Sequence, residues 1–446
     1  MSKTFPPGPT SQELLRRIPS IQSDTLTFLT DISQRFGRVV GFHIAGLPII
    51  VINHPEGIKH VLLDEHRRYS KDTLQYRALS TVTGRGLLTN DGESWLQQRR
   101  LAQPAFSRQR LAHLDDIVIP ATEAMLEGWE PLAQSGQPVD IDAAMMHLTL
   151  QIVGKALFSI DLSRDAVNLT RATLTALDTI IYRARNVFTP PAFIPTLRNL
   201  KFRRALKTLN HAVAEMVSSR RNAGQPGDDL LGMFLRARDE DTGASMSDQQ
   251  VRDEIMTMLI AGHETVASAL TWTWYLLSRH PEESIRARDE INRVLGKRPP
   301  TVSDLEHLPG VGRIFSEALR LYPPAWVISR KALEEDEVLG FNIPRNALVV
   351  ISPYVVHRQA EFWPEPEQFH PERFLSGPPH RFAYLPFGAG PRLCIGYQFA
   401  TLEAQLIITR VLQQYTLEWA HPQAVRMDAL VTLRPHGGLP MHLRKI

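Results

Sequence analysis

The sequence predicts a mainly α-helical fold with a smaller β region, the α+β class. Two patterns support this. Apolar residues recur at helical spacing over most of the stretch from about 55 to 296, whereas short β-branched runs occur near both ends of the chain. No repeat, low-complexity tract or Gly/Ser-rich linker divides the 446 residues. We therefore expect one large domain over 1–446 rather than three domains of ordinary size.

The N-terminal part predicts two helices, at 12–18 and 26–36, because apolar residues there follow helical spacing. A hairpin follows, since the β-branched runs 39–44 and 49–53 are separated by Ala-Gly-Leu-Pro, which favours a turn. The next helical segments are predicted at 93–103, 109–133, 140–158, 166–185, 202–222, 227–238 and 247–279.

The segment 187–195, Val-Phe-Thr-Pro-Pro-Ala-Phe-Ile-Pro, is apolar but too rich in proline to be helical. It is either a loop that faces a ligand or a membrane surface, or a loop packed on its own core. Two more helices and several short strands are predicted after it, at 281–295, 311–321, 338–343, 347–352, 416–420, 430–434 and 441–444, with the last two strands joined around Gly437-Gly438. We expect small sheets near 38–53, 338–352 and 416–444.

The composition excludes several classes of protein. With 43% apolar and 22% charged residues, the chain is not intrinsically disordered. The net charge of +3 is too small to indicate a nucleic-acid partner. The longest apolar stretches are far shorter than the ~18 to 20 residues of a membrane-spanning helix, and the N-terminus does not resemble a secretory signal. We therefore expect a cytoplasmic protein without a transmembrane anchor.

The single cysteine, Cys394, excludes an intrachain disulfide and a multi-cysteine zinc site. It lies in Phe387-Gly-Ala-Gly-Pro-Arg-Leu-Cys-Ile-Gly396, directly before a helical run. Backbone N–H groups and the helix dipole there favour the thiolate, the form that binds a metal. Gly388, Gly390 and Gly396 allow the backbone to approach a flat ligand. A dinucleotide-binding loop is excluded because Leu393 stands where its last glycine is needed.

The predicted helix 247–279 contains Ala261-Gly262-His263-Glu264-Thr265. A zinc-protease helix is excluded, because its second histidine position holds Ala267. Glycine costs about 1 kcal/mol inside a helix, a buried glutamate needs a partner, and the hydroxyl of Thr265 can bond the carbonyl four residues back. We expect a widened turn that offers a polar niche to a small ligand; a tolerated helical irregularity is the alternative.

Two further pairs stand at helical spacing. Glu317 and Arg320 are three residues apart among apolar neighbours, and with Arg373 they could form a buried network that holds the cysteine loop. An exposed pair worth under about 1 kcal/mol is the alternative. Trp95 and Arg99 are four residues apart, so that an indole N–H and a guanidinium could bind a ligand carboxylate. A core tryptophan with a surface arginine is the alternative there.

Together these segments resemble the cytochrome P450 family of haem-thiolate monooxygenases. The cysteine loop matches the family signature Phe-x-x-Gly-x-Arg-x-Cys-x-Gly at every fixed position. The other matching segments follow in the order of the family, and they are Trp95-x-x-x-Arg99, Ala261-Gly262-x-x-Thr265, Glu317-x-x-Arg320 and Pro371-Glu-Arg373-Phe374. The resemblance implies the cytochrome P450 fold, with a long central helix over the haem.

By this resemblance Cys394 is the thiolate ligand of the iron of haem b, within a cofactor-binding loop that includes Phe387 and Gly396. The haem propionates are expected to bind Trp95, Arg99, Arg330 and Arg392. Glu264 and Thr265, in the turn that begins with Ala261 and Gly262, are expected to relay protons to the dioxygen that the enzyme activates. Glu317, Arg320 and Arg373 are expected to fix the cysteine loop.

The implied reaction inserts one oxygen atom from O₂ into a C–H or C=C bond, with two electrons derived from NAD(P)H. The chain has neither the length for a fused reductase nor the cysteines for an iron–sulfur cluster. The electrons are therefore expected from a separate ferredoxin or flavodoxin with its reductase. A peroxide-using hydroxylase or isomerase is disfavoured by Glu264-Thr265, and a haem sensor or carrier remains an alternative from another class.

Residues expected to line the substrate pocket carry no charge, and they are Leu87, Leu88, Ala261, Ala325, Trp326, Val327 and Leu439. An apolar pocket admits fatty acids, terpenoids, steroids and macrolide-like molecules alike. The cluster Pro6-Pro7-Gly8-Pro9 is similar to the hinge that follows a membrane anchor in microsomal members. Because no anchor precedes it here, a soluble, bacterial-type member is expected.

Overall fold

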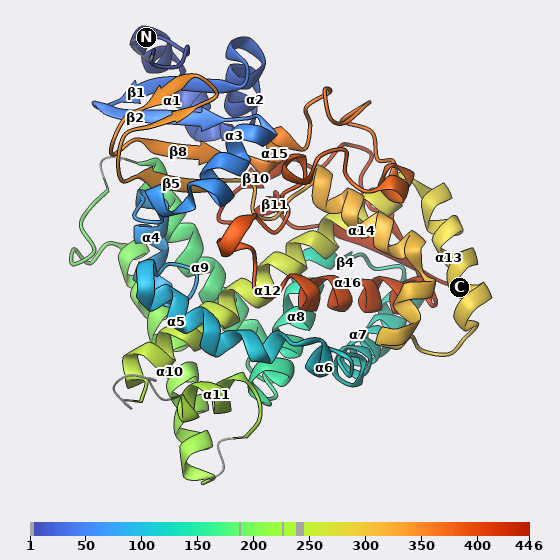
Figure 1. Cartoon of the computed structure of the whole chain (residues 1–446). Coiled ribbons are helices and arrows are strands. Elements are labelled where there is room, and N and C mark those ends of the chain that lie inside the picture. The colour runs from blue at the N-terminus through green and yellow to red at the C-terminus, as the bar shows by residue number, and fades with distance from the viewer. Residues whose placement is uncertain (1–3, 187–188, 225–226, 238–244) are drawn as a thin grey trace. The chain divides into compact units, whose positions relative to one another are not determined.

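The structure is a computed structural model that describes residues 4–186, 189–224, 227–237 and 245–446. Two compact units make up the chain, and each is built from two separate stretches of sequence. Unit 1 comprises 1–77 and 316–394, and unit 2 comprises 78–315 and 395–446. Long helices and a smaller set of short strands confirm the predicted α+β class (Figure 1).

Unit 1 is organised around a five-stranded mixed sheet in the order β1-β2-β8-β5-β3 (Figure 1). Its strands are β1 (Val39–Ile44), β2 (Leu47–Ile52), β8 (Leu348–Ile351), β5 (Ile328–Ala332) and β3 (Tyr69–Ser70). Only β2 and β8 pair in parallel. This parallel pairing joins the segments near 38–53 and 347–352 in one sheet, where the sequence led us to expect two.

Three details of unit 1 differ from the sequence prediction. The β1–β2 turn is only Ala45-Gly46, both with positive φ, so that Leu47 and Pro48 belong to the strand. The segment 338–343 is a hairpin of β6 (Asp336–Val338) and β7 (Phe341–Ile343), not one strand. The missed strand β5 contains Arg330 and Lys331, and charged residues at successive positions hid its apolar pattern.

The helices of unit 1 cover the sheet region and lead into the cysteine loop. They are α1 (Ser11–Ser23), α2 (Thr25–Phe36), α3 (Pro55–Lys59), a π-helical turn His60–Asp64, the start of α4 (Leu74–Thr83), the end of α14 (Pro309–Leu321) and α15 (Pro353–Val356). Short 3₁₀ turns occur at His66–Arg68, Pro371–Ser376, Arg381–Ala383 and Gly390–Arg392. The core of this unit is aliphatic, with Ile50, Ile52, Ile58 and Val349 fully buried.

Unit 2 is the helical part of the molecule (Figure 1). Its helices are α5 (Gly92–Ala102), α6 (Arg108–Leu111), α7 (Asp115–Ser135), α8 (Ile141–Phe158), α9 (Ala166–Arg185), α10 (Leu197–Asn222), α11 (Leu230–Arg236), α12 (Asp248–Arg279), α13 (Pro281–Leu295) and α16 (Tyr397–Leu412). Short 3₁₀ turns occur at Gln103–Phe106 and Val302–His307. The predicted helix 109–133 is divided into α6 and α7. Helix α10 begins five residues before the predicted 202, and α11 is shorter than the predicted 227–238, whose last residue lies outside the described residues. The helices α5, α8, α9, α12 and α13 lie within one residue of the predicted bounds.

Helix α12 is the longest described helix, with 32 residues, and it is buried along most of its length. Helix α8 packs along it. Gly262 permits this close approach, because a Cβ atom there would lie only 3.0 Å from Cγ2 of Val153 on α8. The turn that carries Glu264 and Thr265 is thereby held against a second helix.

Two small sheets complete unit 2. One is β4 (Val139–Asp140), β12 (Pro440–Lys445) and β9 (Tyr415–Trp419), and the other is the hairpin of β10 (Met427–Ala429) and β11 (Leu433–Pro435). Gly437-Gly438 connects β11 to β12 as predicted, but these two strands pair with different partners. The sequence predicted β11 as a longer strand because Leu430, Val431 and Thr432 are apolar or β-branched.

The apolar segment 187–195 is described only from Thr189, because Val187 and Phe188 lie outside the described residues. Residues 190–195 are exposed, and Phe193 retains 77% of its accessible surface. The described part of this segment therefore does not pack on the core of unit 2.

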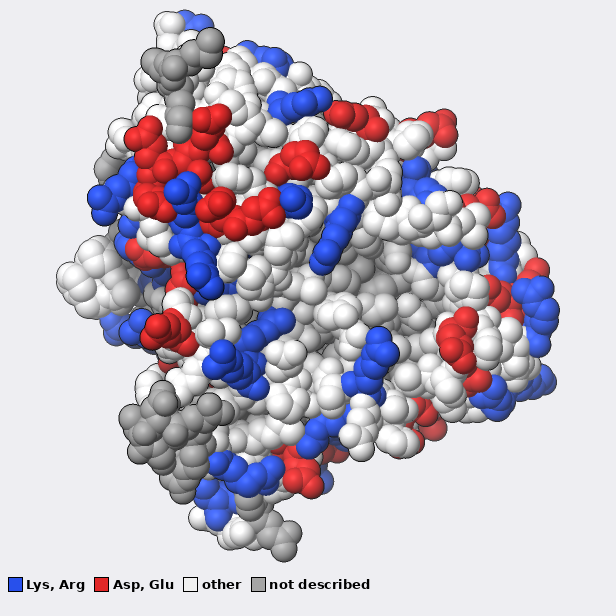
Figure 2. All heavy atoms as spheres, viewed as in Figure 1, with Lys and Arg blue, Asp and Glu red and all other residues white. Residues whose placement is uncertain are grey.

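Charged side chains of both signs are interspersed over the face shown in Figure 2. This agrees with 50 basic and 47 acidic residues in the sequence. Of the helices in the described part of the chain, none combines the length and the apolar character that crossing a membrane requires.

Candidate active site

The loop that carries Cys394 is closed by backbone hydrogen bonds and depends on glycine. The N–H of Cys394 donates to the carbonyl of Phe387 at 3.0 Å, and that of Leu393 donates to the carbonyl of Gly390 at 3.0 Å. Gly390 has φ +67°, and a Cβ there would lie 1.8 Å from the carbonyl oxygen of Leu62. A glycine is therefore needed at this position for the close contact with the backbone of Leu62, and not only for contact with a ligand. The loop leaves Cys394 exposed.

A buried ion network stabilises the segment that leads into this loop. Both carboxylate oxygens of Glu317 on α14 accept from Arg320, at 2.7 and 2.8 Å. One of these oxygens also accepts from Arg373 Nε and from the backbone N–H of His370, both at 2.9 Å. Glu317 and Arg320 have no exposed surface. The predicted network is therefore present, and it is not a solvated helix face.

Arg320 also binds backbone carbonyl groups in the chain beyond α14. Its terminal nitrogens donate to the carbonyls of His357, Pro366 and Gln368, at 2.8, 2.6 and 3.0 Å. A fully buried arginine with all these donors bonded is rigid and costly to replace.

His357 is a structural residue that the sequence analysis missed. The backbone N–H of Leu385 donates to its Nε2 at 2.7 Å, so its Nδ1 carries the proton and donates to the carbonyl of Arg320 at 3.1 Å. Burial lowers the pKa of His357 to about 3, which keeps the ring neutral and suited to both bonds. It links the ion network directly to the residue two positions before Phe387. Only a Pro-Tyr-Val-Val-His run marks it in the sequence.

Arg330 on β5 provides a test of whether this unit suits an anionic cofactor. Its side chain is buried, and its Nη1 donates to the carbonyl of Ser329 at 2.8 Å. No carboxylate in the described part of the chain forms an ion pair with it. A buried cation without a counter-ion is costly, so this position fits a ligand carboxylate such as a haem propionate. Arg392, on the Gly390–Arg392 turn, is half-buried.

The predicted turn on α12 is present, but it is not widened. The chain is α-helical without interruption from Asp248 to Arg279. The hydroxyl of Thr265 donates to the carbonyl of Ala261 at 2.8 Å, as predicted, but a carbonyl oxygen can accept two hydrogen bonds, so the helix keeps its geometry. Thr149 of α8 donates to the carbonyl of His263 at 3.0 Å in the same turn. The expectation of a widened turn is therefore wrong.

Glu264 is the buried acid of this turn. Its side chain is 3% exposed, and its Oε1 accepts from the hydroxyl of Thr432 at 2.9 Å. Burial raises the pKa of Glu264 to about 7, so that the carboxyl group can hold or release a proton near neutral pH. Its neighbour His263 is fully buried, and burial lowers the pKa of this histidine to about 4. His263 is therefore neutral, and its Nδ1 contacts the carbonyl of Leu259.

The other predicted contributors of unit 2 lie on α5 and before α16. Trp95 is buried, and Arg99, one turn further along α5, is half-buried. The burial of Trp95 alone agrees equally with a core tryptophan. Gly396 precedes the first residue of α16, and a Cβ there would meet only the ring of Phe106, at 3.5 Å.

Asp253 and Glu254 on α12 are two further residues that the sequence analysis missed. Asp253 accepts from the backbone N–H of Arg85 at 2.8 Å, and Glu254 accepts from that of Leu87 at 3.1 Å. They hold the segment that precedes α5 against the first turns of α12. The signal that could have identified them is weak, because the two acids follow a polar first turn and directly precede the apolar part of the helix.

The residues predicted to line the substrate pocket differ in exposure. Leu87, Trp326 and Leu439 are buried, Leu88, Ala261 and Val327 are intermediate, and Ala325 is exposed. Leu439 has no exposed surface, and its N–H donates to Asp140 at 2.9 Å. Val431 is a stronger candidate, because it is half-exposed and adjoins Thr432, which contacts Glu264.

Unit 1 thus contains Arg330, Phe387, Arg392 and Cys394 together with the network of Glu317. Unit 2 contains Trp95, Arg99, Gly396 and the turn from Ala261 to Thr265. Within each unit the predicted residues fall on ordered elements.

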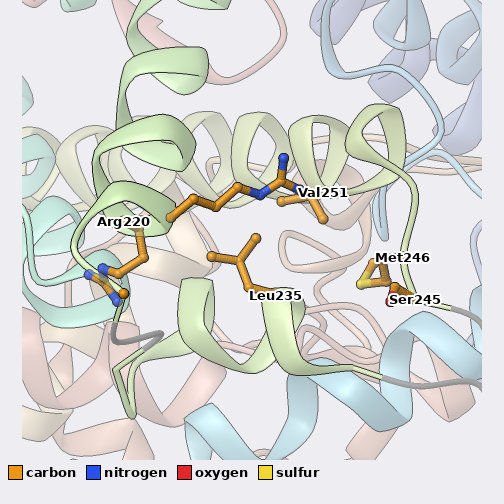
Figure 3. A pocket seen from close by; sticks show the side chains of 7 residues that line it. Arg220, Leu235, Ser245, Met246 and Val251 are labelled. Atoms are coloured by element: carbon orange, nitrogen blue, oxygen red, sulfur yellow. The ribbon is translucent and has the colours of Figure 1, made fainter.

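A separate pocket of about 250 Å³ lies in unit 2, at the end of α10, beside α11 and the start of α12 (Figure 3). Val251, which lines it, is thirteen residues before Glu264, or roughly 20 Å along a helix. Its two arginines already pair with carboxylates, Arg220 with Asp229 and Arg221 with Asp248. This pocket is therefore not part of the predicted site.

A cysteine loop of this kind, on a fold dominated by helices, defines a haem-thiolate protein. Comparison with protein families makes the class specific. Residues 6–437 match the family described as Cytochrome P450, and the chain belongs to that family.

Curated relatives agree over most of the chain. The chain is 36% identical to "Cyclooctatin synthase" of Streptomyces melanosporofaciens, covering 85% of this chain and 83% of that protein. It is 33% identical to "Pentalenene oxygenase" of Streptomyces avermitilis, covering 92% and 90%. It is also 33% identical to "Cyclooctat-9-en-7-ol 5-monooxygenase" of Streptomyces melanosporofaciens, covering 92% and 89%. The chain is thus a cytochrome P450 monooxygenase, an oxidoreductase of the haem-thiolate class.

Proposed function

We propose that residues 1–446 form one haem domain that oxygenates an apolar terpenoid, with Cys394 as the thiolate ligand of haem b. The complete family signature around the chain's single cysteine is the observation that carries this proposal. Haem bound through a cysteine thiolate supplies the O₂-dependent oxidising chemistry of the family.

The residues of the chain divide the remaining tasks. Arg330 and Arg392, with Trp95 and Arg99, bind the haem propionates, and the buried charge of Arg330, which pairs with no carboxylate among the described residues, supports its part in this role. The Glu317 network keeps the cysteine loop in place. Glu264 holds a proton close to neutral pH, and Thr265 orients the group that receives it.

The terpenoid class is supported by the names of the relatives, which are those of oxygenases for pentalenene and cyclooctat-9-en-7-ol. It is also supported by the uncharged character of Leu87, Leu88, Ala261 and Val431. Electrons from NAD(P)H reach this chain through a separate ferredoxin or flavodoxin with its reductase.

The first test is the absorption difference spectrum of the reduced protein with carbon monoxide. We expect the thiolate-type band in the haem-loaded protein and its loss in Cys394→Ser, because an alcohol is a weak iron ligand. A thiolate-type band that persists in Cys394→Ser would refute the assignment of the ligand.

Substrate class is tested by titrating the ferric protein with pentalenene, cyclooctat-9-en-7-ol and lauric acid while following the haem spin state. We expect the two cyclic compounds to give the low-to-high-spin shift at lower concentration than the fatty acid. Tighter binding of lauric acid would refute the terpenoid class. Product formation that needs both O₂ and a reductant would exclude a peroxide-using enzyme, a sensor and a carrier.

A further inference from the structure

Helix α12 and strand β11 are joined by side chains that recur every four residues along one face of the helix. Thr432 donates to Glu264 at 2.9 Å, and Ser268 and Trp272 both donate to the carbonyl of Leu433, at 2.7 and 2.8 Å. Residues four apart lie on one helical face. Thr432 directly precedes β11, so the two hydrogen bonds to Leu433 hold the hydroxyl that contacts Glu264 beside α12.

Strand β11 also carries the basic residue Arg434, which is already paired. Arg434 forms a buried ion pair with Asp142, in the first turn of α8. Asp142 also accepts from Thr271 of α12, at 3.4 Å. Arg434 is close enough to Glu264 to favour its charged form, and Glu264 in turn favours the charged form of Arg434.

The carboxyl groups near Arg434 differ in exposure: Asp142 is buried, Asp428 is half-buried, and Asp140 and Asp178 are exposed. The charged groups that act on Glu264 are Arg434 of β11, Asp142 of α8 and Asp178 of α9, and His263 is its neighbour on α12. Asp178 is in turn affected by Arg198 of α10 and Asp428 of β10, and Asp142 by Asp140, the N-cap residue of α8. His263 is neutral, because burial lowers its pKa to about 4. Asp142 makes the direct ion pair with Arg434, and the two charges act on Glu264 in opposite directions: Arg434 lowers its pKa and Asp142 raises it.

We propose that Asp142 is a positioning residue that favours protonated Glu264 at neutral pH, because it binds the guanidinium of Arg434, which would otherwise stabilise the Glu264 carboxylate. Helix α8 thus contributes a carboxylate that affects the protonation of Glu264 on α12. In this arrangement Thr432 holds the carboxyl group in place. The raised pKa of Glu264, whose largest cause is burial, agrees with this arrangement. The catalytic consequence rests on the proposed function, but the protonation state of Glu264 does not.

The arrangement predicts opposite effects for the two partners. In Asp142→Asn, Arg434 loses its carboxylate and stabilises ionised Glu264, so the pKa of Glu264 falls by about one unit or more, a tenfold change in proton affinity. In Arg434→Gln, the nearest cation is removed, so the pKa of Glu264 rises. A substitution that merely loosened the structure would not shift the two variants in opposite directions.

The experiment uses the haem-loaded full chain in its ferric state. Infrared difference spectra are recorded from pH 5 to pH 9, and the C=O stretch of the protonated carboxyl group is assigned by its absence in Glu264→Gln. The midpoint of that band is compared among the wild type, Asp142→Asn and Arg434→Gln. Thr432→Val and Thr432→Ser are milder variants that should keep the fold: the valine raises the midpoint and the serine restores it.

A lower midpoint in Asp142→Asn with a higher one in Arg434→Gln supports the proposal. Midpoints that move in the same direction, or do not move, overturn it. If either charged variant fails to fold, Thr432→Val without a raised midpoint overturns the positioning of Glu264 by β11. Carbon monoxide spectra of the same samples separate this result from the proposed function, because loss of the thiolate-type band in the wild type refutes only the latter.

Discussion

Glu317 and Glu264 are both buried on helices, one in unit 1 and the other in unit 2, and they differ in how their charge is compensated. Glu317 accepts four hydrogen bonds, from Arg320, Arg373 and the backbone of His370. Glu264 accepts one hydrogen bond from the described residues, from the neutral hydroxyl of Thr432. A carboxylate saturated by cations and N–H groups stabilises a fold, whereas a buried carboxyl group with one neutral donor retains a proton that can be transferred.

The largest effect is expected from the saturated network. Arg320→Lys keeps the charge but loses the planar fork that reaches Glu317 and three carbonyl groups. We expect a loss of about 3 to 5 kcal/mol in the free energy of unfolding, as for other broken buried pairs. The measurement is urea unfolding of the haem-loaded protein.

Arg298→Lys is the matched control for this substitution. Arg298 also makes a two-pronged pair, with Asp304 at 2.6 and 2.7 Å, but half of its side chain is exposed. We expect a loss below about 1 kcal/mol there, because solvent screens exposed pairs. Equal losses in the two variants would show that the burial of the Glu317 network is not what makes it stabilising.

The opposite pattern is expected at the Glu264 turn. Thr265→Ala should retain haem and stability but divert electrons from product to hydrogen peroxide, because proton delivery loses its hydroxyl group. Thr273→Ala is the matched control, since Thr273 makes the same bond to the carbonyl four residues back, at 2.7 Å, on the same helix. We expect several-fold more peroxide per NADH in the first variant only. Equal peroxide yields in both would refute the role of Thr265.

The Glu317 network also shows which parts of the site could be predicted from the sequence and which could not. Helical spacing indicated the Glu317–Arg320 pair, and the resemblance to the family motifs added Arg373 to its network. Spacing could not identify His357, which acts through its backbone neighbours Arg320 and Leu385. Long-range pairs of this kind depend on how the chain folds back, and no local pattern encodes them.

The same reason applies to the environment of Glu264. The sequence indicated that a buried glutamate needs a partner, but Thr432 lies 168 positions further along the chain. Helix α12 was predicted well because its apolar period extends over many turns. Strand β5 was missed because its short run contains the charged residues Arg330 and Lys331, and only the sheet explains the burial of Arg330.

A smaller effect, on stability, is expected from Glu264→Gln. The pKa of Glu264 is raised to about 7 from the ordinary value of 4.5. Wild-type stability therefore falls as the pH rises from about 4.5 to about 7, where the folded protein retains the proton that the unfolded chain has released. The glutamine variant lacks this loss, so its free energy of unfolding should exceed that of the wild type by up to about 3 kcal/mol at pH 8. Parallel stability curves from pH 4 to pH 8 would contradict the raised pKa.

The smallest effect, with the opposite dependence on pH, is expected from Asp304→Asn. Its Arg298 partner lowers the pKa of Asp304, so the carboxylate adds stability above its ordinary value of 3.8, and this is lost as the pH falls through the lowered pKa. Asparagine can still accept the N–H of Thr301 that Asp304 accepts at 2.8 Å, so we expect a loss of only about 1 kcal/mol at pH 7. The loss of stability in Asp304→Asn should become smaller on acidification. The gain of stability in Glu264→Gln should become smaller as the pH falls from about 7 to about 4.5. Urea unfolding at pH 3, 5 and 8 measures both trends. If the difference in stability between variant and wild type changed with pH in the same direction for both substitutions, the distinction between a charge-saturated carboxylate and a proton-holding one would be lost.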